Sequence, residues 1–242
     1  MTTELRQSWE AYWGEVAQAG ETALFDSPSA TAAAVHLRRC MPHVDPALPI
    51  IDLGCGSGRQ TVRLAESFTR VIGVDIAEPA LAIARRDNAA ANVEYRQVDL
   101  LEDAAVAALA TELGEVNVYV RSVLHQLSSD QQQRVLRGVA VLLGHRGVLI
   151  VHELTTLTRW VIRSFIESEE AAPVKFARLQ RHFGMSAATL QDEDRQLDVL
   201  LTRHGLHVIE SGDDTLQTTQ LDADGAPIEL PTAWALARNP LS

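Results

Sequence analysis

The fold of this chain is decided by residues 50–58, which are Ile50-Ile51-Asp52-Leu53-Gly54-Cys55-Gly56-Ser57-Gly58. A short apolar run with an acid near its end leads into a turn with a glycine at every second position. Glycine is required where a backbone turns sharply and approaches a ligand closely, because a Cβ atom would be in the way. The stretch therefore predicts a buried strand, a ligand-binding turn and a following helix.

A second apolar run, residues 71–75, also ends in an acid, Asp75. This acid comes about 20 residues after the first glycine of the turn, the spacing at which a carboxylate accepts hydrogen bonds from the hydroxyls of a ribose. The turn and the acid together predict a cofactor that contains a nucleoside. A glycine turn that joins a strand to a helix without binding any ligand is the alternative.

The spacing of the glycines indicates which cofactor is bound. A dinucleotide fingerprint, G-x-G-x-x-G, would need a glycine at position 59, where this chain has Arg59. The Asp52 carboxylate points toward the turn, where it would repel a pyrophosphate but suit an ammonium group. S-adenosylmethionine combines an adenosine and a cation with no phosphate, so the residues favour it over a nicotinamide cofactor.

At these residues the chain resembles the class I S-adenosylmethionine-dependent methyltransferases, whose first motif is acid-x-G-x-G-x-G. The resemblance implies that Asp52 holds the aminocarboxypropyl end of the cofactor, that Asp75 binds the ribose, and that Asp99 accepts from the adenine amino group. Arg121, at the end of a strand, faces either the cofactor carboxylate or the substrate. The complete predicted cofactor site is Asp52, Gly54, Cys55, Gly56, Gly58, Asp75, Ile76, Asp99, Leu100 and Arg121.

The rest of the chain predicts an α/β fold, a doubly wound, mostly parallel seven-stranded sheet with helical lid inserts. Apolar strands at 50–53, 70–75, 93–98, 116–121 and 147–153 alternate with helices at 58–67, 78–91, 102–113 and 129–143. Such alternation is typical of parallel βαβ units. A helix over about 190–204 and an antiparallel pair of strands near 206–211 and 231–238 are expected to complete the domain.

Two helical segments are expected outside this alternation. Residues 1–46 form an N-terminal lid, which includes a second helix capped by Ser27 and running to Met41. The other insert covers about 155–188, within the Rossmann-like domain of residues 47–242. We expect both inserts to build the substrate pocket.

The predicted catalytic residues are His125 and Glu153. The segment Val123-Leu124-His125-Gln126-Leu127 is similar to the "v-L-H-x-L" segment of small-molecule methyltransferases, although the acid that usually starts the preceding strand is missing. His125 is a candidate general base or a structural histidine. His152 and Glu153 end a strand at the ligand edge of the sheet, where either could deprotonate an acceptor, or simply form a polar rim.

The predicted substrate pocket contains Trp9, Tyr12, Trp13, His152 and Trp160. The first three recur at helical spacing, which is equally typical of a lid over the cofactor and of a helix packed on the sheet. Trp160 either covers an apolar substrate or forms a dimer contact. The histidines and acids match no recognisable metal-binding spacing, so no metal site is expected.

The net charge and the absence of long apolar segments in the sequence exclude some classes of function. The net charge of −11 argues against a nucleic-acid partner, which needs a basic surface. The sequence predicts no signal peptide and no membrane span, so we expect a cytoplasmic monomer or homodimer. The predicted activity is methyl transfer to an O, N, S or C nucleophile of a small molecule. The alternatives are an S-adenosylmethionine-binding enzyme that catalyses a cyclisation or elimination, a nicotinamide-dependent oxidoreductase, and a non-catalytic subunit.

Overall fold

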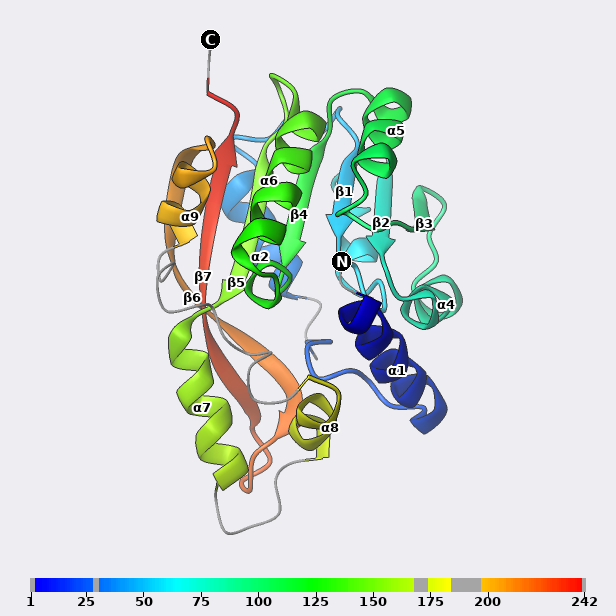
Figure 1. Ribbon diagram of the computed structural model, residues 1–242, viewed down its shortest axis with the longest axis vertical. Helices are drawn as coiled ribbons and strands as arrows, with labels where there is room; N and C mark the ends of the chain where they lie inside the picture. Colours follow the sequence, from blue (N-terminus) through cyan, green and yellow to red (C-terminus); the bar gives the residue numbers. More distant parts are fainter. Residues whose placement is uncertain (1–2, 28–30, 168–173, 184–196, 241–242) are drawn as a thin grey trace.

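The structure is a computed structural model that describes residues 3–27, 31–167, 174–183 and 197–240. Its centre is a seven-stranded sheet in the order β3-β2-β1-β4-β5-β7-β6, with helices on both faces (Figure 1). This arrangement confirms the predicted α/β fold. Among the described helices, none is long and apolar enough to span a membrane.

Five strands are parallel and form the half of the sheet that carries the predicted motifs. They are β1 (Ile50–Leu53), β2 (Val71–Asp75), β3 (Val93–Gln97), β4 (Asn117–Arg121) and β5 (Leu149–Leu154). All residues of β1 and β5 are buried, as expected for strands covered by helices on both faces. Their carboxyl ends lie along one edge of the sheet, close to the N-terminal helix (Figure 1).

Two antiparallel strands, β6 (His207–Leu221) and β7 (Pro227–Arg238), complete the sheet through a β5–β7 pair. Both are longer than predicted. Most residues of β6 are exposed or half-buried, because it is an edge strand. It therefore contains polar residues such as Asp213 and Asp214, and the sequence shows no apolar pattern from which its full length could be predicted. The long β6–β7 ribbon continues beyond the parallel strands toward the helices of the second insert (Figure 1).

Most of the described helices fall close to the predicted ranges. The helices are α1 (Thr3–Ala19), α2 (Thr31–Cys40), α3 (Thr61–Leu64), α4 (Glu78–Asp87), α5 (Asp103–Leu113), the short 3-10 helix η1 (Leu124–Gln126), α6 (Ser129–Leu143), α7 (Thr156–Glu167), α8 (Val174–Phe183) and α9 (Leu197–Arg203). The start of α6 is fixed by a capping box between Ser128 and Gln131. Residues 28–30 of the predicted second helix and the predicted helical residues 190–196 lie outside the described residues.

The helix predicted over 58–67 is only one turn long. Residues up to Gln60 belong to the turn after β1, and the Gln60 side chain accepts a hydrogen bond from the backbone N–H of Ala33 in α2. Thr61 begins α3 and donates its hydroxyl to Asp52 in β1. These contacts hold the segment as a compact loop rather than as a long helix.

The second insert has its own apolar core. Ile162 of α7 and Phe176 of α8 pack with Leu216 and Leu230 of the β6–β7 ribbon and with Leu24 of the N-terminal segment. The insert and the N-terminal segment therefore meet in one cluster below the parallel strands, beside the edge that carries the predicted site.

Candidate cofactor and acceptor site

The glycine-rich turn takes a conformation that other residues rarely adopt. Gly54, Gly56 and Gly58 have φ angles of 76°, 53° and 78°. A Cβ atom on Gly56 would lie 2.8 Å from the ring of Trp13 in α1, so the turn and the N-terminal helix are in direct contact. A Cβ on Gly54 would lie 2.5 Å from a methyl group of Val123, beyond the end of β4. The glycines of the turn are therefore required, because a side chain at Gly54 or Gly56 would collide with Val123 or Trp13.

Asp75 joins the end of β2 to this turn. Its carboxylate accepts hydrogen bonds from the backbone N–H groups of Gly56 and Ala77, each at 2.9 Å. Burial raises the pKa of Asp75, while the backbone hydrogen bonds act in the opposite direction. Because an ionised carboxylate has about four acceptor positions, Asp75 retains capacity for the two hydroxyls of a ribose.

A cavity lies between the turn, the carboxyl ends of β2 and β4, and α1. Eight of the ten predicted cofactor residues line it: Gly54, Cys55, Gly56, Asp75, Ile76, Asp99, Leu100 and Arg121. The remaining wall includes Val98, Leu101 and Leu127, so most of the surface is apolar with polar groups at a few points. This composition is typical of a small-molecule site.

Asp52 and Gly58, predicted to contact the cofactor, do not line the cavity. The Asp52 carboxylate is buried and accepts the Thr61 hydroxyl at 2.5 Å. Burial raises the pKa of Asp52 to about 6, against the opposing effects of Thr61 and the Arg121 charge. A Cβ on Gly58 would collide with Tyr95, so this glycine allows the turn to pack on the sheet. Both residues therefore contact the segments around the turn rather than the cavity itself.

The aromatic residues of α1 both pack in the core and line the cavity. Tyr12 is in edge-to-face contact with Trp9 and with Trp13, with ring centroids 5.4 and 5.6 Å apart. The backbone N–H of Leu24 donates to the Tyr12 hydroxyl, and burial raises the pKa of Tyr12 to about 12. All three aromatic side chains line the cavity, so α1 forms one of its walls.

The two predicted catalytic residues lie outside the cavity and contact each other. Nδ1 of His125 is 2.7 Å from Oε2 of Glu153, and both side chains are buried. Glu153 also accepts hydrogen bonds from the backbone N–H groups of Val123, Leu124 and His125. Its carboxylate therefore fixes the backbone after β4, which forms part of the cavity wall.

A second cavity adjoins the first. Arg121 and Ser122 line both, and the second is otherwise lined mainly by polar residues, including His36 of α2, His152 of β5 and Asp214 of β6. His152 therefore lines the cavity that adjoins the first one. Trp160 lines neither cavity, and its side chain is 65% exposed on α7.

Burial controls the charge of the histidines in this second cavity. It lowers the pKa of His36 to about 3 and that of His152 well below the usual range, and the positive charge of Arg121 adds to both effects. Both imidazoles are therefore neutral at physiological pH. The Nδ1 atom of His36 is 2.9 Å from the Tyr119 hydroxyl.

Several lining residues were not predicted from the sequence. Phe25 and Asp26 come from the irregular segment after α1, and only the tertiary fold brings them to the cavity. Ser122 has a φ of 59°, unusual for a residue other than glycine, and it separates β4 from η1. Its place after an apolar strand, at the ligand edge of the sheet, was the available signal.

Arg121 indicates what such a cavity could hold. Its Nη2 donates to the carbonyl of Phe25 at 2.9 Å, and its buried Nη1 has no hydrogen-bond partner among the described residues. A buried guanidinium donor without a partner favours a bound carboxylate or similar oxygen group. The unpaired donor, the Asp75 carboxylate and the glycine turn together fit S-adenosylmethionine.

The fold and this site define the class I S-adenosylmethionine-dependent methyltransferases, and comparisons with known proteins agree. The model of the methyltransferase domain family matches residues 50–147. A methyltransferase structure from Anabaena variabilis is 28% identical, with 98% of this chain and 95% of that chain covered and a TM-score of 0.88. Residues 50–147 of this chain therefore match a methyltransferase domain, and the whole chain has the fold of an S-adenosylmethionine-dependent methyltransferase.

Two further proteins are similar, one over half of the chain and one in fold. An uncharacterized methyltransferase from Synechocystis is 28% identical over 123 residues, which are 49% of this chain and 52% of the relative, so the match spans about half of that protein. The N-methyltransferase NodS from Bradyrhizobium japonicum, in complex with S-adenosyl-L-homocysteine, is similar in fold. It is 18% identical with a TM-score of 0.59, and 97% of this chain and 99% of that chain are covered.

Proposed function

We propose that this protein transfers the methyl group of S-adenosylmethionine to a nucleophilic atom of a small molecule. The adenosine would lie between Asp75, Asp99 and Leu100, and the carboxylate of the cofactor would meet the unpaired donor of Arg121. When bound, the cofactor supplies a methyl group on a sulfonium that is a good leaving group. The net charge of −11 supports a small acceptor over a polyanion such as RNA.

The observation that carries this proposal is the shared wall of the two cavities. Arg121 and Ser122 line both, so an acceptor in the second cavity lies beside a cofactor in the first. The second cavity opens at the carboxyl ends of β4 and β5, where open α/β sheets bind their ligands. Its polar lining suits an acceptor with hydroxyl, amine, thiol or carboxylate groups.

The residues of the chain would accelerate the reaction mainly by positioning. An in-line displacement needs the nucleophile about 3–3.5 Å from the methyl carbon and a site without competing water. Trp9, Tyr12 and Trp13 supply an apolar wall, and an aromatic face near the sulfonium would add a cation–π attraction. Arg121 would fix the carboxylate of the cofactor or an oxygen of the acceptor.

The test is product analysis with a labelled cofactor. Purified protein is incubated with trideuteromethyl S-adenosylmethionine and a panel of small thiols, phenols, amines and carboxylic acids. We expect one acceptor to gain the mass of a single labelled methyl group for each S-adenosylhomocysteine formed. Turnover of the cofactor without a label in any acceptor would contradict methyl transfer and would favour a cyclisation or elimination.

A further inference from the structure

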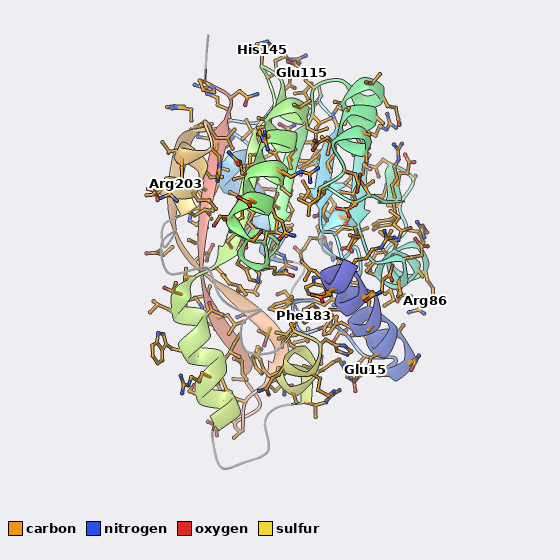
Figure 2. The ribbon with its side chains drawn as sticks, in the orientation of Figure 1. Glu15, Arg86, Glu115, His145, Phe183 and Arg203 are labelled. Carbon is orange, nitrogen blue, oxygen red and sulfur yellow. The ribbon has the colours of Figure 1, made fainter. Side chains whose placement is uncertain are left out.

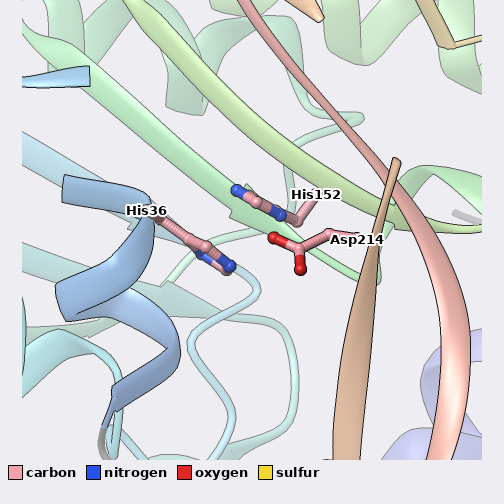
Figure 3. Close-up of side chains that lie close together, drawn as sticks. All are labelled: His36, His152 and Asp214. Atoms are coloured by element: carbon pink, nitrogen blue, oxygen red, sulfur yellow. The ribbon is translucent and has the colours of Figure 1, made fainter. Parts of the chain in front are cut away.

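Two histidines and an aspartate from three separate elements meet on the wall of the second cavity. His36 comes from α2, His152 from the end of β5 and Asp214 from β6, and their side chains point toward one another (Figure 3). One ligand atom from each, a ring nitrogen or a carboxylate oxygen, lies within 4.8 Å of the other two. The three residues are far apart in the sequence, so no local motif indicates the cluster.

The rings are held by packing rather than by solvent. His36 and His152 are 6% and 4% exposed, and their rings are stacked with centroids 3.2 Å apart. Within the described part of the chain, the backbone carbonyl of His152 accepts from Ser122, whereas its ring is in contact with the ring of His36. The Tyr119 hydroxyl is at Nδ1 of His36, which leaves Nε2 of that ring available. The cluster therefore presents buried, neutral nitrogen atoms with lone pairs into a cavity.

The carboxylate is also held in place. Oδ2 of Asp214 accepts from Nη1 of Arg39, and Oδ1 accepts from the backbone N–H of Thr215 at 2.9 Å. Each oxygen still has a second lone pair. Hydrogen bonds of this kind, like that of Tyr119 on His36, are the outer contacts that orient the ligands of metal sites.

We propose that His36, His152 and Asp214 bind a divalent transition-metal ion of the zinc type. Two imidazoles and one carboxylate are a donor set that zinc accepts, whereas Mg²⁺ and Ca²⁺ prefer oxygen ligands throughout. Zinc bonds of about 2.0–2.2 Å place tetrahedral ligand atoms about 3.4 Å apart. Small side-chain rotations from the present separation of up to 4.8 Å bring the atoms to that distance.

Three protein ligands leave a coordination position open to the cavity. The charges of Arg39 and Arg121 lie nearby, so an anionic ligand such as a thiolate or alkoxide suits that position. The ion would then hold the nucleophilic atom of the acceptor beside Arg121 and Ser122, at the border of the cofactor cavity. This role of the ion rests on the proposed function, whereas binding of the ion does not.

The experiment is a metal titration of the full chain after dialysis against a chelator. Zn²⁺ and Co²⁺ are added in separate titrations, with calorimetry for both and visible absorption for Co²⁺. We expect one ion per chain, the intense d–d bands of a four-coordinate Co²⁺ site, and a rise in unfolding temperature with Zn²⁺ concentration.

The ligands are tested with His152→Ala and Asp214→Asn, which should weaken Zn²⁺ binding at least about 10-fold. His207→Ala is the matched control, since this exposed histidine starts the same strand as Asp214. Wild-type protein that binds neither ion, or binding that survives His152→Ala in a folded variant, overturns the metal site. Because the readout is metal binding without cofactor or acceptor, its failure is distinguishable from failure of methyl transfer.

Discussion

Glu153 accepts three backbone N–H groups and lies beside His125, and this single side chain fixes the segment that follows β4. The sequence places His125 and Glu153 at the ligand edge of the sheet but gives no sign that they face each other. Their mutual contact, away from the cavity, favours a positioning role over proton transfer with an acceptor. Ser122, which has the unusual φ of 59°, directly precedes the three residues whose N–H groups Glu153 accepts.

Glu153→Gln tests that role. The amide keeps the size of the side chain but replaces an acceptor oxygen with a donor, so one or more buried N–H groups lose their partner. We expect the free energy of unfolding to fall by about 2–3 kcal/mol, because hydrogen bonds to a buried charged group are lost. Urea denaturation measures it. Unchanged stability together with a large loss of turnover would instead assign Glu153 to the chemistry.

At the scale of elements, α1 is joined to α8 by charge as well as by aromatic packing. Glu15 of α1 contacts Arg178, Arg181 and His182 of α8. The hydrogen bond with His182 lowers the pKa of Glu15 to about 2; burial acts in the opposite direction, and the charges and hydrogen bond of Arg178 and Arg181 add to the lowering. Phe183 of α8 packs on Trp9, and Figure 2 marks both Glu15 and Phe183 at this junction. Helix α1 is therefore joined to the second insert by both ion pairs and aromatic contacts.

Glu15→Gln tests the junction. A carboxyl with a lowered pKa in the folded state stabilises the protein above its ordinary pKa of 4.5, and this stabilisation is lost as the pH falls toward 2. The side chain is 35% exposed, so solvent screening limits the loss at pH 7 to about 1 kcal/mol. Thermal unfolding measured at pH 7 and near pH 3 should show that the difference in unfolding temperature between Glu15→Gln and wild type is smaller at the lower pH.

The control for this variant is Glu66→Gln, which removes an exposed pair with Arg63 three residues away and should have little effect. If the difference in unfolding temperature between Glu15→Gln and wild type is the same at both pH values, the charge of Glu15 contributes nothing to stability. The same stability for both proteins at pH 7 would also contradict the account.

The parts of the fold that the sequence predicted are those governed by local patterns. Apolar runs, the glycine turn and the acid of Asp75 carry their signal within a few residues, and each lies where it was expected. The polar outer face of β6 hid its length, because an edge strand need not alternate clearly. Ala23, Phe25 and Asp26 reach the cavity only through tertiary packing, and the cluster of His36, His152 and Asp214 combines residues from distant elements.

At the scale of the whole molecule, two units share one sheet. The parallel strands and their glycine turn form the cofactor cavity, and the β6–β7 ribbon with α7 and α8 forms a cap below it (Figure 1). The N-terminal segment packs on both units through Trp13 and Leu24. The second cavity lies where residues of both units meet, so under the proposed function both units would shape the acceptor site.

The central claim is that the cavity beside Asp75 binds S-adenosylmethionine. Calorimetric titration of the purified chain with S-adenosylmethionine, S-adenosylhomocysteine and NAD tests it most directly. We predict micromolar binding of the first two and none of NAD, with at least about 10-fold weaker binding by Asp75→Ala, since hydrogen bonds to a charged group contribute about 1.5–3 kcal/mol. Binding of NAD, no binding of either S-adenosyl compound, or full affinity in Asp75→Ala would contradict it.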